Sequence, residues 1–233
     1  MRTNMVPFKL AEHRIRVETA RFGPFLFQIG VDASRVEILY QRVSDAQRRF
    51  RGSPLSQVAN RLEREVAVSS VFGTNSIEGG ALSEKETQIA LELDPRKVKD
   101  TEQQRVVNLK AAYNLSRNMA TSPGWVLDLE FICQIHAAIT AKLPHEHNQP
   151  GLLRDNPKGI NTFVGDAAHG GRYKPPQYGA DIRLLLENLV EWHRKLQAED
   201  VPVLIRAPLV HYYYELIHPF WDGNGRVGRV IPI

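Results

Sequence analysis

The sequence of 233 residues holds a single cysteine, Cys133, so a disulfide bond within the chain is excluded. Cys133 lies in an apolar stretch, where a small buried hydrophobe is the better interpretation than a reactive thiol. The sequence also lacks an apolar run long enough to cross a bilayer, and its first residues lack the apolar stretch of a secretory signal. We therefore expect no membrane part and, by default, a cytoplasmic location.

A strong charge of either sign is missing as well. The 30 basic and 26 acidic residues give a net charge of +4, and the basic residues are spread along the chain. This distribution is typical of a solvated surface of mixed charge. Neither a recognition helix nor a focused basic stripe is visible, so nucleic acid is an unlikely partner for this part of the chain, and a DNA-binding regulator is the weakest alternative.

Apolar residues repeat at helical intervals through most of the chain, which predicts an all-α fold, a helical bundle with one small β-hairpin. Capping boxes at Ser34 and Ser83, and candidate caps at Asp100 and Asp128, mark helix starts. Further helices are expected from about residues 56, 180 and 202. The first thirty residues are expected to be irregular.

The last predicted helix ends at His218, because Pro219 disfavours helical backbone for the residue before it. Pro208 inside that helix is expected to kink it. We divide the chain into an N-terminal helical extension, 1–54, and a main domain, 55–233, whose final helix is expected to be truncated.

Residues 144–178 lack helical periodicity and are rich in proline and glycine, as in a working loop. Its centre, 159–165, could form one arm of the β-hairpin, and Arg172 to Lys174 could form the other.

The segment from His218 to Arg229 concentrates residues suited to phosphate chemistry. Gly223, Asn224 and Gly225 allow backbone N–H groups to converge on an anion at a helix start. Asp222 adds a hard carboxylate of the kind that holds Mg²⁺ beside phosphates. Arg226 and Arg229 follow at a spacing of three, which places both on one helical face. Each residue alone is more simply a turn, a surface arginine or a core histidine, but together they favour phosphoryl or nucleotidyl transfer.

These residues match H-P-F-x-[DE]-G-N-G-R-x-x-R at every specified position, and the segment resembles the signature of the Fic (filamentation induced by cAMP) domain family. Pro150 to Arg154 and Tyr173 to Pro176 resemble the entry and exit of that family's target-docking hairpin, the flap. The resemblance covers the chain from about residue 55 to its end.

The resemblance implies a protein adenylyltransferase that uses ATP and Mg²⁺ to place AMP on a Ser, Thr or Tyr hydroxyl of a target protein or of itself. His218 corresponds to the general base, Asp222 to the Mg²⁺ ligand and Arg229 to the arginine that binds the γ-phosphate. The remaining implied ATP and phosphate contacts are Gly223, Asn224, Gly225 and Arg226. Gly225 is intact, which favours AMP transfer over phosphorylation.

The segment Thr74 to Gly79 fits [ST]-x-x-x-E-[GN], which resembles the family's autoinhibitory helix motif. We expect Glu78 to form a bidentate pair with Arg229 in the place of the γ-phosphate. Removal of AMP, or another nucleotidyl or phosphoryl transfer at the same site, stays open as an alternative.

A target is expected to add a β-strand along the flap, with Thr162, Phe163 and Val164 as the docking edge. Oligomerisation stays open, and so does the identity of the target.

Overall fold

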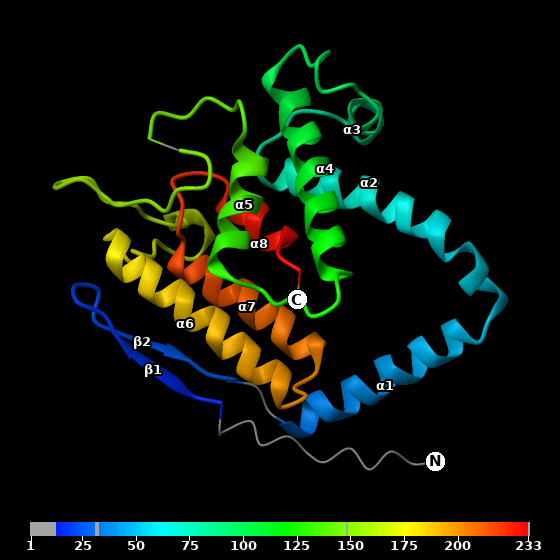
Figure 1. Ribbon diagram of the computed structural model, residues 1–233, viewed down its shortest axis with the longest axis horizontal. Coiled ribbons are helices and arrows are strands. Elements are labelled where there is room, and N and C mark those ends of the chain that lie inside the picture. The colour runs from blue at the N-terminus through cyan, green and yellow to red at the C-terminus, as the bar shows by residue number, and fades with distance from the viewer. Residues whose placement is uncertain (1–12, 31–32, 148, 233) are drawn as a thin grey trace.

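The computed structural model describes residues 13–30, 33–147 and 149–232. Within them it contains eight α-helices and one two-stranded antiparallel sheet (Figure 1), so the predicted helical fold with a small β component is confirmed. The elements in chain order are β1 (Ile15–Glu18), β2 (Pro24–Phe27), α1 (Ala33–Arg51), the 3-10 helix η2 (Pro54–Val58), α2 (Ala59–Ile77), α3 (Glu84–Leu91), α4 (Thr101–Ala120), α5 (Leu129–Thr140), the 3-10 helix η3 (Ala167–His169), α6 (Gly179–Ala198), α7 (Val203–Ile217) and α8 (Asn224–Val230).

Three helix starts follow from local capping. The Ser83 hydroxyl accepts the N–H of Glu86, whose carboxylate in turn accepts the N–H of Ser83, so the predicted capping box begins α3. Asp100 and Asp128 cap α4 and α5 by accepting an N–H three residues further on. The predicted box at Ser34 lies outside the described side chains.

The short helix α8 packs against α4, α5 and α7 (Figure 1). The core around it is apolar and fully enclosed; its members include Leu109, Ile135, Leu185, Trp192, Tyr214, Phe220 and Val227. Since packed interiors resist displacement, the core fixes the position of the helix that carries Arg226 and Arg229.

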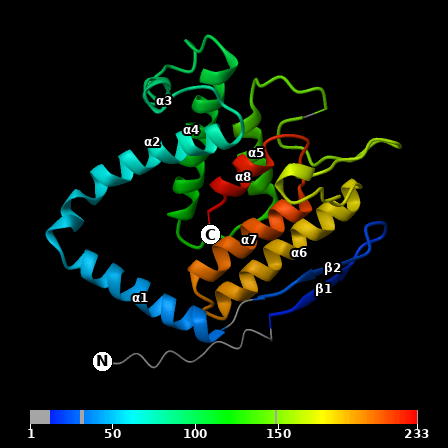
Figure 2. The same cartoon turned by 180° about the vertical axis from the view of Figure 1, so that it is seen from behind.

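The β1–β2 hairpin lies along α6 (Figures 1 and 2), and its residue pairs run from Ile15 with Phe27 to Glu18 with Pro24. The expectation of irregular backbone was wrong here. Phe27 is fully buried, and its ring lies 5.8 Å from that of Trp192 and 5.1 Å from that of Tyr213. The hairpin is thus stabilised by aromatic residues that are far away in sequence.

The turn between β1 and β2 is held on the first turn of α6 by one carboxylate. Asp181 is 2% exposed, and it accepts the backbone N–H groups of Ala20 at 3.0 Å, Arg21 at 3.0 Å and Phe22 at 2.9 Å. Three hydrogen bonds to a charged acceptor are among the stronger contacts of a protein. The turn therefore has a defined place beside the flap.

Helices α1 and α2 form two arms that meet at η2, and the far end of α2 reaches the neighbourhood of α8 (Figures 1 and 2). Helix α7 continues through Pro208, and the expected kink there stays a prediction. Among the helices of the described residues, none has both the length and the apolar character that a bilayer crossing requires.

Candidate functional site

Helix α7 ends at Ile217, as Pro219 predicted, and His218 adopts left-handed backbone with φ 49° and ψ 64°. This conformation is uncommon for a residue other than glycine. It turns the chain sharply between α7 and the loop that follows, so the His218 side chain faces the start of α8.

A cavity of about 350 Å³ lies between α7, this loop, the start of α8 and the end of α2. Its lining combines the predicted catalytic residues with the end of the predicted inhibitory motif: Glu78, His211, Glu215, His218, Trp221, Asp222, Gly223, Asn224, Gly225 and Arg229. The structure therefore brings together residues that are about 150 positions apart in sequence, as the Arg229–Glu78 separation of 151 shows.

The His218 side chain is 20% exposed. Burial, together with the positive charge of Arg154, lowers the pKa of His218 to about 4, although a hydrogen bond involving Glu215 opposes the shift. The imidazole is therefore neutral at pH 7 and can accept a proton.

Glu215 lies one helical turn before His218, and its Oε2 is 3.8 Å from Nδ1 of the imidazole. Burial raises the pKa of Glu215 to about 7, with Arg229 lowering it and Glu78 raising it. Since His218 is neutral at pH 7, the two side chains do not form an ion pair there. Glu215 was not predicted from the sequence, although its spacing of three from His218 places it on the same helical face.

The loop before α8 is closed by the side chain of Asn224, which is 2% exposed. Its amide donates to the carbonyl of Phe220 at 2.8 Å and accepts the N–H of Phe220 at 2.9 Å. Gly223 has φ 79°, a conformation that glycine adopts without strain. Asn224 thus shapes the loop with its side chain, while the backbone of Gly223 to Gly225 faces the cavity.

Arg226 and Arg229 were predicted to lie on one helical face, but their side chains have different surroundings. Arg226 is 3% exposed, does not line the cavity, and donates from Nη2 to Oδ2 of Asp222 at 2.7 Å. Asp222 lies four residues earlier and accepts a hydrogen bond from the Arg226 guanidinium, which holds that side chain away from the cavity. Burial alone would raise the pKa of Asp222, but the charge and hydrogen bond of Arg226 bring it below its ordinary value.

Asp222 is the loop residue suited to hold Mg²⁺. Mg²⁺ is usually bound by one or two carboxylates together with substrate phosphates and water. The Asp222 side chain is 35% exposed, lines the cavity and stays ionised at pH 7. Among the described residues, no cluster of three His, Cys, Asp or Glu side chains forms a complete metal cage. The residues therefore fit a Mg²⁺ ion that arrives with a nucleotide.

Glu78 is the C-cap residue of α2, and its Oε1 accepts a hydrogen bond from Nη2 of Arg229. The pair is joined through one carboxylate oxygen rather than through the bidentate arrangement that we expected. This carboxylate lies against Gly225, where a Cβ atom would be only 2.3 Å from Oε1 of Glu78. The Glu78 carboxylate thus occupies the space beside both Arg229 and the segment Gly223 to Gly225, which we call the glycine loop.

Two further residues position the loop, and neither role was predicted from the sequence. Arg154, 1% exposed, donates from Nε to the carbonyl of His218 at 2.6 Å. His136 stacks on Phe220 with 3.7 Å between ring centroids, accepts the N–H of Gly151 at Nδ1, and so carries its proton on Nε2 toward the carbonyl of Asp222.

Among the described residues of the flap, the backbone forms a single β-bridge. Val164 and Tyr173 exchange two backbone hydrogen bonds of 2.9 and 2.8 Å, which matches the two predicted arms but is a single bridge. Thr162 is half-buried, its N–H donating to Oε1 of Gln177 at 2.7 Å, and Phe163 is 43% exposed. None of the predicted docking residues lines the 350 Å³ cavity.

The fold is that of Fic-domain proteins. A Fic family protein from Desulfovibrio desulfuricans superposes with a TM-score of 0.67 at 22% identity, over 86% of this chain and 56% of that one. A Fic domain containing signaling protein from Bacteroides thetaiotaomicron gives a TM-score of 0.63 at 19% identity, over 75% of this chain and 63% of that one.

Residues 126–232 match the Fic/DOC family. Among curated relatives, "Protein adenylyltransferase fic-1" of Caenorhabditis elegans is 24% identical over 83% of this chain and 36% of its own length. A "Probable protein adenylyltransferase" of Aquifex aeolicus is 29% identical over 64% of this chain and 46% of its own length. The chain thus spans about a third to a half of the length of these relatives.

Proposed function

We propose that this chain is a protein adenylyltransferase that transfers AMP from ATP to a hydroxyl group of a protein. The observation that carries the proposal is the single cavity in which a neutral His218, the glycine loop, Asp222 and Arg229 converge. The names of the relatives support the same reaction class.

In this reaction His218 accepts the proton of the target hydroxyl while that oxygen attacks the α-phosphorus of ATP. The bond between the α-phosphorus and the oxygen bridging to the β-phosphorus breaks, and pyrophosphate leaves with the electron pair. A Mg²⁺ ion held by Asp222 would supply charge neutralisation for the α- and β-phosphates. Arg229 is placed to bind the γ-phosphate, and the glycine loop to donate N–H groups to phosphate oxygens.

We further propose that Glu78 inhibits this reaction from within the same chain. Its carboxylate accepts a hydrogen bond from Arg229 and lies against Gly225, so a γ-phosphate and Glu78 would compete for one place. An ATP molecule bound beside Glu78 would have its phosphates displaced from the in-line geometry. Positioning supplies much of the rate in such transfers, so the displacement should lower activity strongly.

The test is incubation with Mg²⁺ and ATP labelled at the α-phosphate. We expect strong labelling of protein by Glu78→Gly, weak labelling by wild type and none by His218→Ala. Glu92→Gly is the matched control, because Glu92 is an exposed C-cap residue of another helix, and it should behave as wild type.

Equal labelling by wild type and Glu78→Gly would refute inhibition by Glu78. Labelling that persists in His218→Ala would refute the assignment of the base. Release of AMP from a pre-modified protein by wild type alone would indicate the reverse reaction.

A further inference from the structure

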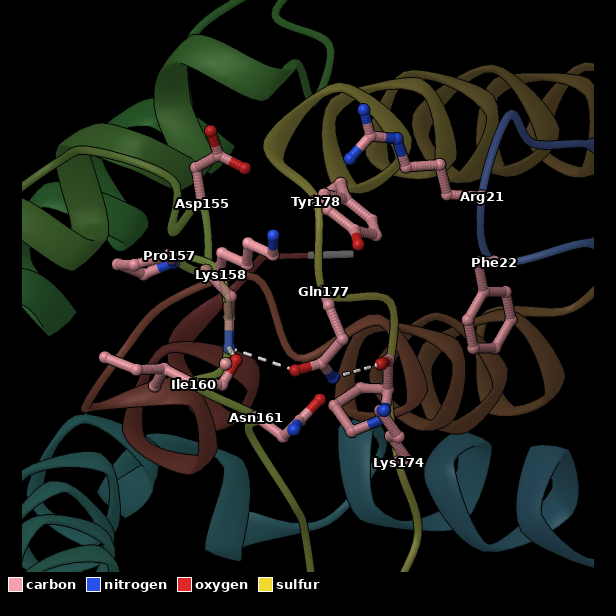
Figure 3. Close-up of a pocket in the computed structure, with 13 residues that line it drawn as sticks. Arg21, Phe22, Asp155, Pro157, Lys158, Ile160, Asn161, Lys174, Gln177 and Tyr178 are labelled. Atoms are coloured by element: carbon pink, nitrogen blue, oxygen red, sulfur yellow. Dashed lines mark hydrogen bonds between the residues drawn. The ribbon is translucent and has the colours of Figure 1, made fainter.

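A second and larger cavity, of about 830 Å³, lies at the base of the flap and shares no lining residue with the catalytic cavity. Three segments form it: the β1–β2 turn with Arg21 and Phe22, the flap entry at 155–161 and the flap exit at 174–178. Figure 3 shows the turn on one side, Asp155 to Asn161 on the other, and Gln177 and Tyr178 between them.

Hydrogen bonds join the walls of this cavity, which we call the basal cavity. Gln177 accepts the N–H of Thr162 at 2.7 Å and donates to the carbonyl of Thr162 at 3.2 Å. Asn156, 8% exposed, donates to Oε1 of Gln177 at 3.0 Å. On the opposite side, Asp181 holds the turn that carries Arg21. The cavity is therefore built before any partner arrives, which reduces the entropy cost of binding.

Positive charge dominates the lining. Arg21, Lys158 and Lys174 stand against one carboxylate, Asp155, whose Oδ1 already accepts the N–H of Gly179 at 2.8 Å. Within the described part of the chain, neither lysine forms an ion pair or a side-chain hydrogen bond, and both are exposed. An arrangement of free ammonium groups around a preformed hollow favours an anionic partner.

The cavity also has apolar and aromatic surface. The guanidinium of Arg21 lies 4.1 Å from the ring centroid of Tyr178, which is 39% exposed. Ile160 is 42% exposed, and Phe22 forms part of the wall. Contacts of this kind suit the side chains and backbone of a polypeptide better than a small inorganic anion.

The position of the cavity ties it to the flap edge. Lining residues 159–161 come directly before Thr162, Phe163 and Val164 in the chain. A polypeptide paired with that edge advances about 3.3 Å per residue, so it would enter the basal cavity within a few residues.

We propose that the basal cavity binds an acidic segment of the target polypeptide, close in sequence to the hydroxyl that is modified. This inference rests on the proposed transfer to a protein hydroxyl. A polypeptide fits better than a nucleic acid, because Asp155 would repel a run of phosphates and the three cations do not form an extended stripe.

The experiment measures binding of the fluorescently labelled protein to an array of random-sequence peptides, with ATP absent. We compare wild type, Lys158→Glu/Lys174→Glu, and the control Lys97→Glu/Lys99→Glu. The control lysines are exposed, lie between α3 and α4, and do not line the cavity. Both double variants change the net charge equally, so they separate local from overall charge.

Peptides bound by wild type and by the control variant should be enriched in Asp and Glu. In Lys158→Glu/Lys174→Glu, binding of those peptides should fall about tenfold, since two attractive pairs become repulsive. A bound set without acidic enrichment, or an equal fall in both double variants, would overturn the inference.

A single-stranded DNA oligonucleotide that binds wild type more tightly than the acidic peptides, through the same two lysines, would overturn it as well. Because binding is read without ATP, its failure is distinguishable from failure of AMP transfer. Labelled AMP transfer with no acidic preference leaves the proposed function intact and refutes only the basal cavity's role.

Discussion

Arg154 donates from Nε to the carbonyl of His218 at 2.6 Å, although the two residues are 64 positions apart. The same guanidinium donates to Oδ1 of Asn156 at 2.7 Å and to the carbonyl of Pro176. One buried side chain thus joins the two ends of the flap to the residue proposed as the base. Arg154 therefore links the position of the flap to the backbone of His218.

Replacing Arg154 by methionine should destabilise the protein, because several buried carbonyls lose their donor at once. We expect a loss of about 3 kcal/mol in the free energy of unfolding, measured by urea denaturation. The pKa of His218 should also rise, since the charge of Arg154 contributes to its lowering. Arg183→Met, at an exposed position of α6, should change stability little; equal losses in both variants would contradict the role of Arg154.

The neutral state of His218 predicts a specific pH dependence of stability. The pKa is about 4 in the folded protein and about 6.5 when unfolded, so the unfolded state binds more protons between these values. The contribution of His218 to the free energy of unfolding therefore falls by about 2 kcal/mol as the pH is lowered from about 7 to 5.

Glu215, with its pKa raised to about 7, increases the free energy of unfolding as the pH falls. His193, with its pKa lowered to about 4, decreases it, as His218 does. The contribution of His218 is therefore obtained by comparing the pH dependence of the free energy of unfolding of wild type with that of a variant at His218. Urea denaturation of His218→Asn should show a loss between pH 7 and pH 5 that is about 2 kcal/mol smaller than in wild type. Parallel curves for the two proteins would mean that His218 is not held neutral.

Gly225→Ala should block nucleotide binding rather than relieve inhibition. The added methyl would lie 2.3 Å from Oε1 of Glu78 and 3.1 Å from Nη2 of Arg229, so it fills the place beside the glycine loop. In a Glu78→Gly background we still expect ATP affinity, measured by calorimetry, to fall about tenfold or more, because this close approach needs glycine. Unchanged affinity in that double variant would show that phosphates do not bind against Gly225.

Gln177→Ala should loosen the flap edge without disturbing the catalytic cavity. The Thr162 N–H donates to Oε1 of Gln177 at 2.7 Å, and this bond would be lost. Hydrogen–deuterium exchange at Thr162 should accelerate at least about tenfold, since a lost hydrogen bond corresponds to roughly 1.5 kcal/mol of protection.

ATP affinity should stay unchanged in Gln177→Ala, because Gln177 does not line the catalytic cavity. Arg172→Ala serves as the control; its guanidinium lies 4.3 Å from the Phe163 ring centroid, outside the hydrogen-bond network of Gln177. Unaltered exchange at Thr162 in the glutamine variant would contradict the cross-linked flap base.

Structural features that depend on contacts between residues close in sequence could be predicted from the sequence. The caps at Ser83, Asp100 and Asp128 could be found because each acts on an N–H three residues away. The β1–β2 hairpin could not, since its turn depends on Asp181, about 160 residues further along the chain.

The same distinction holds within the site. The loop His218 to Gly225 was found from its residue types, and the Glu78–Arg229 contact from the family resemblance. Arg154 was missed as a positioning residue because its acceptors include backbone carbonyls, which leave no pattern in a sequence. The Asp222–Arg226 pair was overlooked despite its spacing of four residues, which is itself a signal.

Helix α2 determines how freely the Glu78 carboxylate can move. The helix has 19 residues, which at 1.5 Å per residue is a length of about 28 Å. Glu78 stands at one end, and η2 and α1 lie at the other. The end that carries Glu78 is the packed one, because Val71, Thr74 and Asn75 are buried there and α2 contacts α3, α4 and α8. Withdrawal of the carboxylate from Arg229 would therefore require this end of α2 to separate from its neighbours, so packing holds the Glu78–Arg229 contact together with the hydrogen bond.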